Sequence, residues 1–332
     1  MSKRNVTYFG GPIFDGERLL DGHAALFEDG LLAEIRPMGE ITGGSETIDL
    51  NGDILSPGYV DLQVNGGDGI MFNDDPSVAT LRRIAAAHRS LGATRILPTL
   101  ITDTAEMTRA AVEAAVAAIE SEVPGIAGLH LEGPHLSVKR KGAHDVSLIR
   151  PMKEEDLSLL IDAAGKLPAL MVTIAPENVT TRQVREMAEA GILVSLGHTD
   201  AGFSTCLEYA DAGACCVTHL FNAMSQLGNR EPGVVGAAVA DGRLSAGLIA
   251  DGIHVHSASM ATAWSSKTGP GSIFLVSDAM AVAGSSQEEF HGYKLGPFVC
   301  HVGSQNGLGQ EIHRRHDSGI FLASSFPVFI RP

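Results

Sequence analysis

Residues 170–198 read LMVTIAPENVTTRQVREMAEAGILVSLGH and contain one full unit of the pattern that decides the fold. An apolar run at 170–174 is followed by an amphipathic segment at 181–190 and by a second apolar run at 193–197. Near-continuous apolar strands that alternate with helix-length segments are typical of a parallel sheet covered on both faces. This stretch therefore predicts a strand, a helix and a parallel strand.

The same unit repeats on both sides of this stretch. Eight apolar runs of strand length lie at 59–65, 95–99, 128–132, 170–174, 193–197, 216–219, 246–250 and 273–278. Helix-length segments between them lie at 76–91, 104–121, 154–164, 181–190, 204–212 and, least clearly, 234–240. We expect Asp75 to cap the first helix, with Pro76 at its first position. Eight such units predict a TIM-like (β/α)8 barrel. An open doubly wound sheet is the alternative, but it does not require eight evenly spaced units.

Residues 1–56 have a different pattern of apolar residues. Short apolar stretches are separated by the turn signals Asp29-Gly30 and Asn51-Gly52, a pattern that favours a small β layer. About 50 residues are marginal for an independent core. We therefore expect a small β segment at 1–56, a barrel at 57–290 and a divergent tail at 291–332.

Composition excludes several classes of protein. The chain has 332 residues and a formal net charge of −15, which is unsuited to wrapping nucleic acid. The N-terminus lacks the apolar core of a signal peptide, and no run approaches the ~18 apolar residues of a membrane span. The four cysteines, Cys206, Cys215, Cys216 and Cys300, form no C-x-x-C pair. These features predict a cytoplasmic protein that binds neither nucleic acid nor membrane.

Three residues at predicted strand ends have the chemistry of metal ligands. Glu132 ends the third strand, and His198 and His219 end the fifth and sixth. Because active sites of barrels form where strands end, we expect these side chains to meet. One carboxylate and two imidazoles make a site for one divalent ion, with Zn²⁺ the expected metal. Each histidine alone is more often a core or capping residue.

Further polar residues follow other strands. Asp278 comes after the eighth strand and is a candidate general base, although an Asp there also commonly caps a helix. Arg230 and His254 are candidates for binding an anionic group, and Asn222 could add hydrogen bonds. His144 follows closely on the end of the third strand.

Two sequence features are interpreted as structural. The basic run Lys139-Arg140-Lys141 lies in a loop-like stretch, and we interpret it as a solvated loop. The Gly66-Gly67-Asp68-Gly69 run lacks the spacing of a phosphate loop and predicts a tight turn.

Several motifs in the right order carry a resemblance. HLEGPH with KGAH, VSLGHTDA, THLFNAM, DGIHVH and VSDAM resemble the N-acetylglucosamine-6-phosphate deacetylases of the amidohydrolase superfamily, from about residue 5 to about residue 290. The resemblance implies a barrel with a small β-sandwich, usually in a homodimer. It implies metal-dependent removal of acetate from N-acetylglucosamine 6-phosphate, in amino-sugar breakdown. A deacetylase for the galactosamine epimer is the alternative of the same class.

The resemblance also implies roles for individual residues. Glu132, His198 and His219 match the metal ligands, and Asp278 matches the catalytic acid and base. The positions that match contacts to the sugar phosphate are His144, Asn222, Ala223, Arg230 and His254. Some phosphate contacts in this family come from the neighbouring subunit, and Arg230 is the residue expected to do so.

The chain departs from this pattern in two places. Many amidohydrolases carry His-x-His after the first strand, where this chain has Gln63-Val64-Asn65, so we expect a single metal. After Glu289 the sequence shows no helical period and no family motif. We expect this tail to be frameshifted or otherwise divergent, and to leave the N-terminal strands without the partners that the family's C-terminal strands supply. The rival interpretation is an inactive relic that at most binds sugar phosphate.

Overall fold

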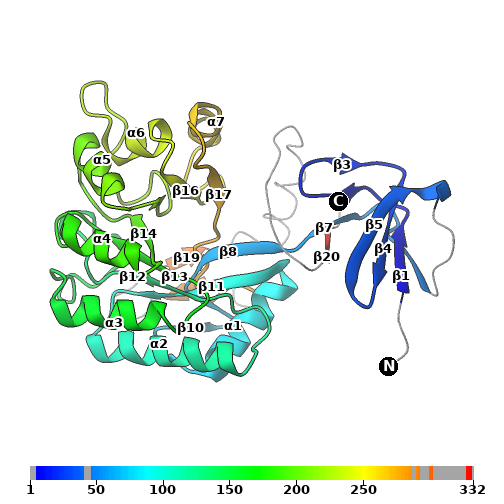
Figure 1. The fold of residues 1–332 in the computed structure, drawn as a ribbon, viewed down its shortest axis with the longest axis horizontal. Helices are drawn as coiled ribbons and strands as arrows, with labels where there is room; N and C mark the ends of the chain where they lie inside the picture. Colours follow the sequence, from blue (N-terminus) through cyan, green and yellow to red (C-terminus); the bar gives the residue numbers. More distant parts are fainter. Residues whose placement is uncertain (1–4, 41–45, 286–288, 292–298, 302–326, 331–332) are drawn as a thin grey trace. The chain divides into compact units, whose positions relative to one another are not determined.

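The structure, a computed structural model, describes residues 5–40, 46–285, 289–291, 299–301 and 327–330 (Figure 1). The chain divides into two compact units. The small unit comprises Met1–Val60, His88–Arg95 and Gly303–Pro332. The large unit comprises Asp61–Ala87 and Ile96–Val302.

The large unit is built on an eight-stranded sheet in the order β17-β16-β15-β14-β13-β12-β11-β8. The pairs from β11 to β17 are all parallel. The strands are β8 (Tyr59–Val64), β11 (Ala93–Ile101), β12 (Leu129–Glu132), β13 (Leu170–Ile174), β14 (Leu193–Leu196), β15 (Cys216–Val217), β16 (Ser245–Leu248) and β17 (Ile273–Leu275). The eight strands predicted from the apolar runs are thus confirmed.

The ends of this sheet meet just beyond its last strand. Val64 forms a parallel bridge with Ala279, and the Asn65 backbone N–H donates to the Ala279 carbonyl at 2.8 Å. The Ser277 N–H donates to the Asp61 carboxylate at 3.2 Å. These contacts join the first strand to the segment after the eighth, as a TIM-like barrel requires.

Seven α-helices accompany the strands in the described residues (Figure 1). They are α1 (Val78–Ser90), α2 (Ala105–Glu120), α3 (Glu154–Ala164), α4 (Thr181–Glu189), α5 (Phe203–Asp211), α6 (Gly233–Ala240) and α7 (Ser257–Ser266), with 3-10 turns η1 (Met38–Glu40) and η2 (Val138–Arg140). The expected start of α1 is wrong by two residues. Ser77, not Asp75, accepts the Thr80 backbone N–H at 3.2 Å, while Asp75 accepts the hydroxyls of both residues. Within the described residues, no helix has both the length and the apolar character needed to cross a membrane.

A hairpin follows the first barrel strand. Strands β9 (Gly66–Gly67) and β10 (Ile70–Met71) pair across Asp68 and Gly69, whose φ angles are 53° and 82°. Two successive positive φ angles are typical of a two-residue hairpin turn. The predicted tight turn is confirmed.

The small unit contains two four-stranded sheets, ordered β5-β4-β1-β6 and β20-β7-β2-β3. Their strands are β1 (Asn5–Phe9), β2 (Ile13–Phe14), β3 (Leu19–Leu20), β4 (His23–Glu28), β5 (Leu31–Pro37), β6 (Glu46–Asp49), β7 (Ile54–Pro57) and β20 (Pro327–Ile330). Ile13 and Leu55 from one sheet share a buried cluster with Ala25 and Phe27 from the other. The shared core makes this unit a small β-sandwich.

One segment of the tail differs from expectation. Strand β20 pairs antiparallel with β7 over four residues, so the N-terminal strands do gain a C-terminal partner. Strands β18 (Glu289–His291) and β19 (Val299–His301) pair with each other. The remainder of the tail predicted to be divergent lies outside the described residues.

Candidate metal centre

Three buried side chains converge where barrel strands end. Glu132 is the last residue of β12, and His198 and His219 each lie two residues beyond the end of their strands, β14 and β15. The Glu132 Oε1 atom lies 3.2 Å from His198 Nε2 and 3.1 Å from His219 Nε2. The two Nε2 atoms are 2.9 Å apart. All three residues are at most 5 % exposed.

The donor chemistry of this cluster fits a divalent cation. His198 Nδ1 lies 2.8 Å from the Arg140 carbonyl oxygen, so this nitrogen donates a hydrogen bond, and Nε2 is left as the nitrogen whose lone pair can bind a metal. That lone pair faces a carboxylate oxygen and a second imidazole nitrogen. Tetrahedral Zn²⁺, with bonds of about 2.0–2.2 Å, holds its ligand atoms roughly 3.3 Å apart. The separations observed here are close to that value.

The backbone turns sharply at the residues that reach this centre. His198, His219 and Asp278 have φ angles of 47°, 30° and 51°. Non-glycine residues adopt this left-handed conformation at a cost, and such strain is concentrated at functional sites. At the ends of β14, β15 and β17 it turns three polar side chains out of the ladder.

One side chain from the first barrel strand, β8, and one from the residue just after it bind two carboxylates of the site. Gln63 Nε2 donates to Glu132 Oε1 at 3.2 Å, and Asn65 Nδ2 donates to Asp278 Oδ1 at 2.7 Å. Burial and the negative charge of Glu132 raise the pKa of Asp278 to about 6. The Gln63 and Asn65 positions therefore supply hydrogen bonds to carboxylates.

His144 is packed against this cluster. Its ring meets that of His198 edge to face, with centroids 4.4 Å apart. The Thr102 backbone N–H donates to His144 Nδ1 at 3.2 Å, so the neutral ring carries its proton on Nε2. Burial lowers the pKa of His144 to about 3 and keeps the ring neutral.

The other predicted binding residues lie in loops. Asn222 Nδ2 donates to the carbonyl of His219 at 3.3 Å, and the adjacent Ala223 has a φ of 47°. Arg230 is exposed. His254 is exposed as well, and its Nδ1 lies 2.6 Å from an oxygen of Asp251.

The basic run near the third strand is not simply solvated. Lys139 and Arg140 both form ion pairs with Asp200, a residue that the sequence analysis did not single out. Its partners lie 61 and 60 residues away along the chain, so no local pattern could have revealed these ion pairs.

The barrel region matches a known family. Residues 54–281 match the amidohydrolase family, which is more than half of the chain. The chain belongs to the amidohydrolase family. Amidohydrolases hold divalent metal in such barrels, and Glu132, His198 and His219 are the one cluster of this kind found among the described residues.

Relatives of this amidohydrolase share one named activity class. The chain is 42 % identical over 286 residues to the N-acetylgalactosamine-6-phosphate deacetylase of Shewanella sp. (strain ANA-3), covering 84 % of this chain and 72 % of the relative. It is 35 % identical over 271 residues to the N-acetylglucosamine-6-phosphate deacetylase of Haemophilus influenzae, covering 81 % of this chain and 70 % of the relative.

Solved structures agree with the fold. The crystal structure of N-acetylglucosamine-6-phosphate deacetylase from Pasteurella multocida is similar with a TM-score of 0.82 and 31 % identity, covering 97 % of this chain and 81 % of that one. A mutant of the Mycobacterium smegmatis deacetylase, in complex with N-acetyl-D-glucosamine 6-phosphate, is similar with a TM-score of 0.80 and 30 % identity. The match covers 92 % of this chain and 77 % of that one.

A polar chain of hydrogen bonds runs through the strands of the amidohydrolase barrel. His130 Nε2 lies 2.8 Å from the Thr173 hydroxyl, which lies 2.7 Å from that of Thr218. The Ser195 hydroxyl is also 2.7 Å from Thr218. Burial lowers the pKa of His130 to about 4. These residues tie β12, β13 and β14 to the Thr218–His219 turn and satisfy their buried polar atoms within the barrel.

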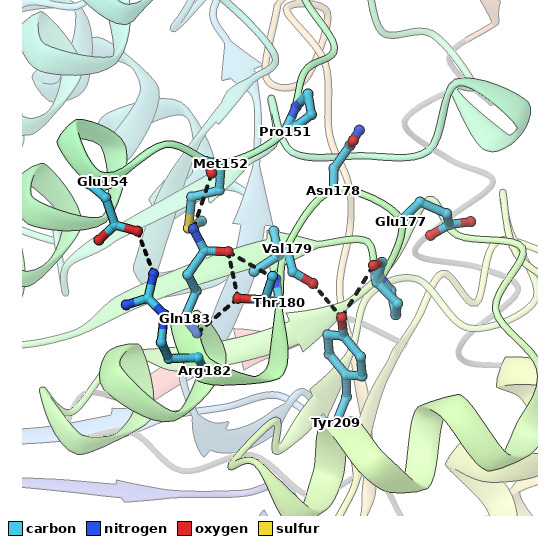
Figure 2. A pocket seen from close by; sticks show the side chains of 11 residues that line it. Pro151, Met152, Glu154, Glu177, Asn178, Val179, Thr180, Arg182, Gln183 and Tyr209 are labelled. Carbon is cyan, nitrogen blue, oxygen red and sulfur yellow. Dashed lines mark hydrogen bonds and ion pairs between the residues drawn. The ribbon is translucent and has the colours of Figure 1, made fainter.

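A pocket of about 380 Å³ lies between the β13–α4 loop and the start of α3 (Figure 2). Its polar side chains are engaged with one another, with the backbone or, for Glu177, with the Thr199 hydroxyl as well. Tyr209 donates to the carbonyls of Pro176 and Val179, and Gln183 donates to the Met152 carbonyl at 3.1 Å. Arg182 pairs with Glu154. None of the predicted site residues lines this pocket, which we interpret as a structural feature of the loop.

Proposed function

We propose that this amidohydrolase hydrolyses the N-acetyl group of N-acetylglucosamine 6-phosphate, giving glucosamine 6-phosphate and acetate. The observation that carries the proposal is the convergence of Glu132, His198 and His219 on one point, with Asp278 held by Asn65 near their charges. Relatives named as deacetylases of N-acetylated amino-sugar 6-phosphates support the substrate class.

The chain would hold one divalent ion, and Zn²⁺ suits a Glu-His-His set. When bound there, such an ion supplies Lewis acidity and lowers the pKa of water. A second ion would require a pair of imidazoles at positions 63 and 65. Gln63 and Asn65 occupy these positions and bind carboxylates through their amides. This arrangement supports a single-metal centre.

Asp278 is the proton carrier in this proposal. Its carboxylate takes a proton from water as the water oxygen attacks the acetyl carbon, and it later gives a proton to the sugar nitrogen as the C–N bond breaks. Asn65 fixes one oxygen of this carboxylate at 2.7 Å and so sets its direction. His144, whose proton is on Nε2, is placed to donate a hydrogen bond to the carbonyl oxygen as negative charge develops.

The loop residues would bind the remainder of the substrate. Asn222, Ala223 and His254 are proposed to contact the sugar phosphate, with Arg230 as the cation that pairs with phosphate. We propose a homodimer in which Arg230 reaches the partner's site, because the residue is exposed in the single chain. A cytoplasmic location is proposed because Cys206, Cys215 and Cys216 are free thiols.

A second candidate substrate is N-acetylgalactosamine 6-phosphate. The observation that favours it is the 42 % identity to a relative named for that epimer. The two substrates differ only in the direction of one hydroxyl, so the metal centre and Asp278 would act identically on both.

Acetate release by the purified protein tests both substrates. We expect about one divalent ion per chain and turnover of at least one phosphorylated epimer, with much weaker turnover of unphosphorylated N-acetylglucosamine. His198→Ala should lose both metal and activity. Two ions in an unsupplemented preparation would contradict the single-metal proposal. A folded, metal-loaded protein that releases no acetate from either epimer would be the inactive relic.

A further inference from the structure

The segment 137–142 wraps around the ring of His198. The Ser137 backbone N–H donates to the His198 carbonyl at 2.9 Å, and His198 Nδ1 donates to the Arg140 carbonyl at 2.8 Å. Gly142 lies so close that an added Cβ would be 3.0 Å from His198 Cε1. The backbone of this loop therefore determines both the direction and the protonation pattern of the ring.

The loop is bound back to the chain just beyond His198. Arg140 donates from Nε and Nη2 to Asp200 Oδ1, at 2.8 and 2.6 Å, and Lys139 binds the other oxygen of Asp200. Asp200 is itself fixed, because its backbone N–H donates to Glu177 Oε1 at 2.9 Å and the Thr199 hydroxyl donates to Glu177 Oε2 at 2.6 Å. Glu177 is one of the residues that line the pocket, on the loop that leads from β13 to α4, and Figure 2 shows its carboxylate directed away from the other labelled side chains.

His198 needs such support for two reasons. Its φ of 47° is a conformation that persists only where the surroundings enforce it. The acceptor of its Nδ1–H is a main-chain carbonyl in a loop, so the position of that acceptor depends on what holds the loop. Arg140 is about one third exposed and Asp200 about one quarter, which places their pair at the outer side of the loop.

We propose that the Asp200–Arg140 ion pair is a positioning pair for the metal centre. The chain leads from His198 to Asp200, the ion pair joins Asp200 to Arg140, and the Arg140 carbonyl accepts from His198 Nδ1. The ion pair thus holds the Arg140 carbonyl in place and keeps His198 Nε2 directed at Glu132 and His219. Groups that orient a ligating histidine typically change metal affinity 10- to 100-fold when removed. The proposal rests on the metal centre of the proposed function.

The test measures Zn²⁺ affinity by competition with a chromogenic chelator, on full-length wild type, Asp200→Ala and Arg140→Ala. We expect both variants to bind Zn²⁺ about 10- to 100-fold more weakly. The double variant should bind Zn²⁺ no more weakly than Asp200→Ala alone, because Asp200→Ala already removes the partner of Arg140. Glu154→Gln, which breaks the exposed pair with Arg182, is the matched control and should bind as wild type does.

A second measurement separates positioning from folding. Thermal melting of the metal-free proteins reports stability without the ion, and we expect Arg140→Ala to melt close to wild type while its Zn²⁺ affinity falls. Unchanged Zn²⁺ affinity in both single variants would overturn the proposal. So would losses that simply add in the double variant. If wild type itself binds no Zn²⁺, the metal centre of the proposed function fails rather than the positioning pair.

Discussion

Asp278 is the residue whose removal should affect chemistry alone. Asp278→Asn keeps an acceptor for Asn65 Nδ2 but cannot carry a proton between water and the leaving nitrogen. We expect kcat to fall by about 10² to 10⁴ with metal content unchanged. Steady-state acetate release together with elemental analysis checks this. A near-wild-type kcat would remove Asp278 from the proposed role.

Arg230 should affect substrate binding, and hence KM, rather than the chemical step. Arg230→Ala removes an exposed guanidinium, and a charge-assisted hydrogen bond is worth about 1.5–3 kcal/mol, which corresponds to roughly a 10- to 100-fold rise in KM. We expect that rise for the phosphorylated sugar and little change for the unphosphorylated one. Equal losses with both sugars would argue against a phosphate contact.

The sequence predicts some residues of the site better than others, for a physical reason. Glu132, His198 and His219 could be brought together in advance because parallel strands in a barrel end on one face. Asp200 and Arg140 could not, because their pairing depends on how two loops fold. The sequence of the basic run at 139–141 therefore predicts a solvated loop, although Lys139 and Arg140 form ion pairs.

The N-terminus of helix α3 provides a test of how the stability of the fold depends on pH. Burial acts to raise the pKa of Asp156, but hydrogen bonds from Arg150 at 2.7 Å and the Lys153 N–H at 2.9 Å outweigh it and lower the pKa below 3.8. Because the pKa of Asp156 is lower in the folded protein than the ordinary value of 3.8, its carboxylate stabilises the fold fully above pH 3.8. This stabilisation is lost as the pH falls through the pKa of the folded protein. The nearby His135 has a pKa of about 4 and stays neutral above pH 5.

Asp156→Asn should therefore lower stability by about 1 kcal/mol, or roughly 2–4 °C in Tm, at pH 7. The gap from wild type should stay constant between pH 7 and pH 5 and narrow only below about pH 3.8. Thermal melts at several pH values check the sign. A gap that closes by pH 5.5 would show that the pKa of Asp156 is not lowered.

Element boundaries show which sequence signals were strong. Strand β13, with the sequence LMVTI, is almost wholly apolar and has the predicted bounds 170–174. Helix α7 was missed because its sequence, SASMATAWSS, is rich in small polar residues and buries only Ala263. A helix without a continuous apolar face has no periodicity to detect.

At the scale of the whole molecule, the small unit is built from distant parts of the chain. Its second sheet consists of three N-terminal strands, β2, β3 and β7, and the C-terminal strand β20. No sequence signal marks this strand, because its four residues follow a tail with no motif or period. Without β20, strand β7 would present an unpaired edge, which invites association with other chains.

A chain that ends at residue 326 should thus be less stable and more prone to associate. It loses the antiparallel pairing of Pro327–Ile330 with β7, and a few ladder hydrogen bonds at about 0.5–1.5 kcal/mol each amount to about 1–3 kcal/mol. A chain that ends at residue 330 keeps β20 and is the matched control. Thermal melting and size-exclusion chromatography of the three proteins check the expectation. If the chain that ends at 326 melts and elutes as the control does, β20 contributes nothing to the sandwich, and its stability must come from the shared core of Ile13, Leu55, Ala25 and Phe27.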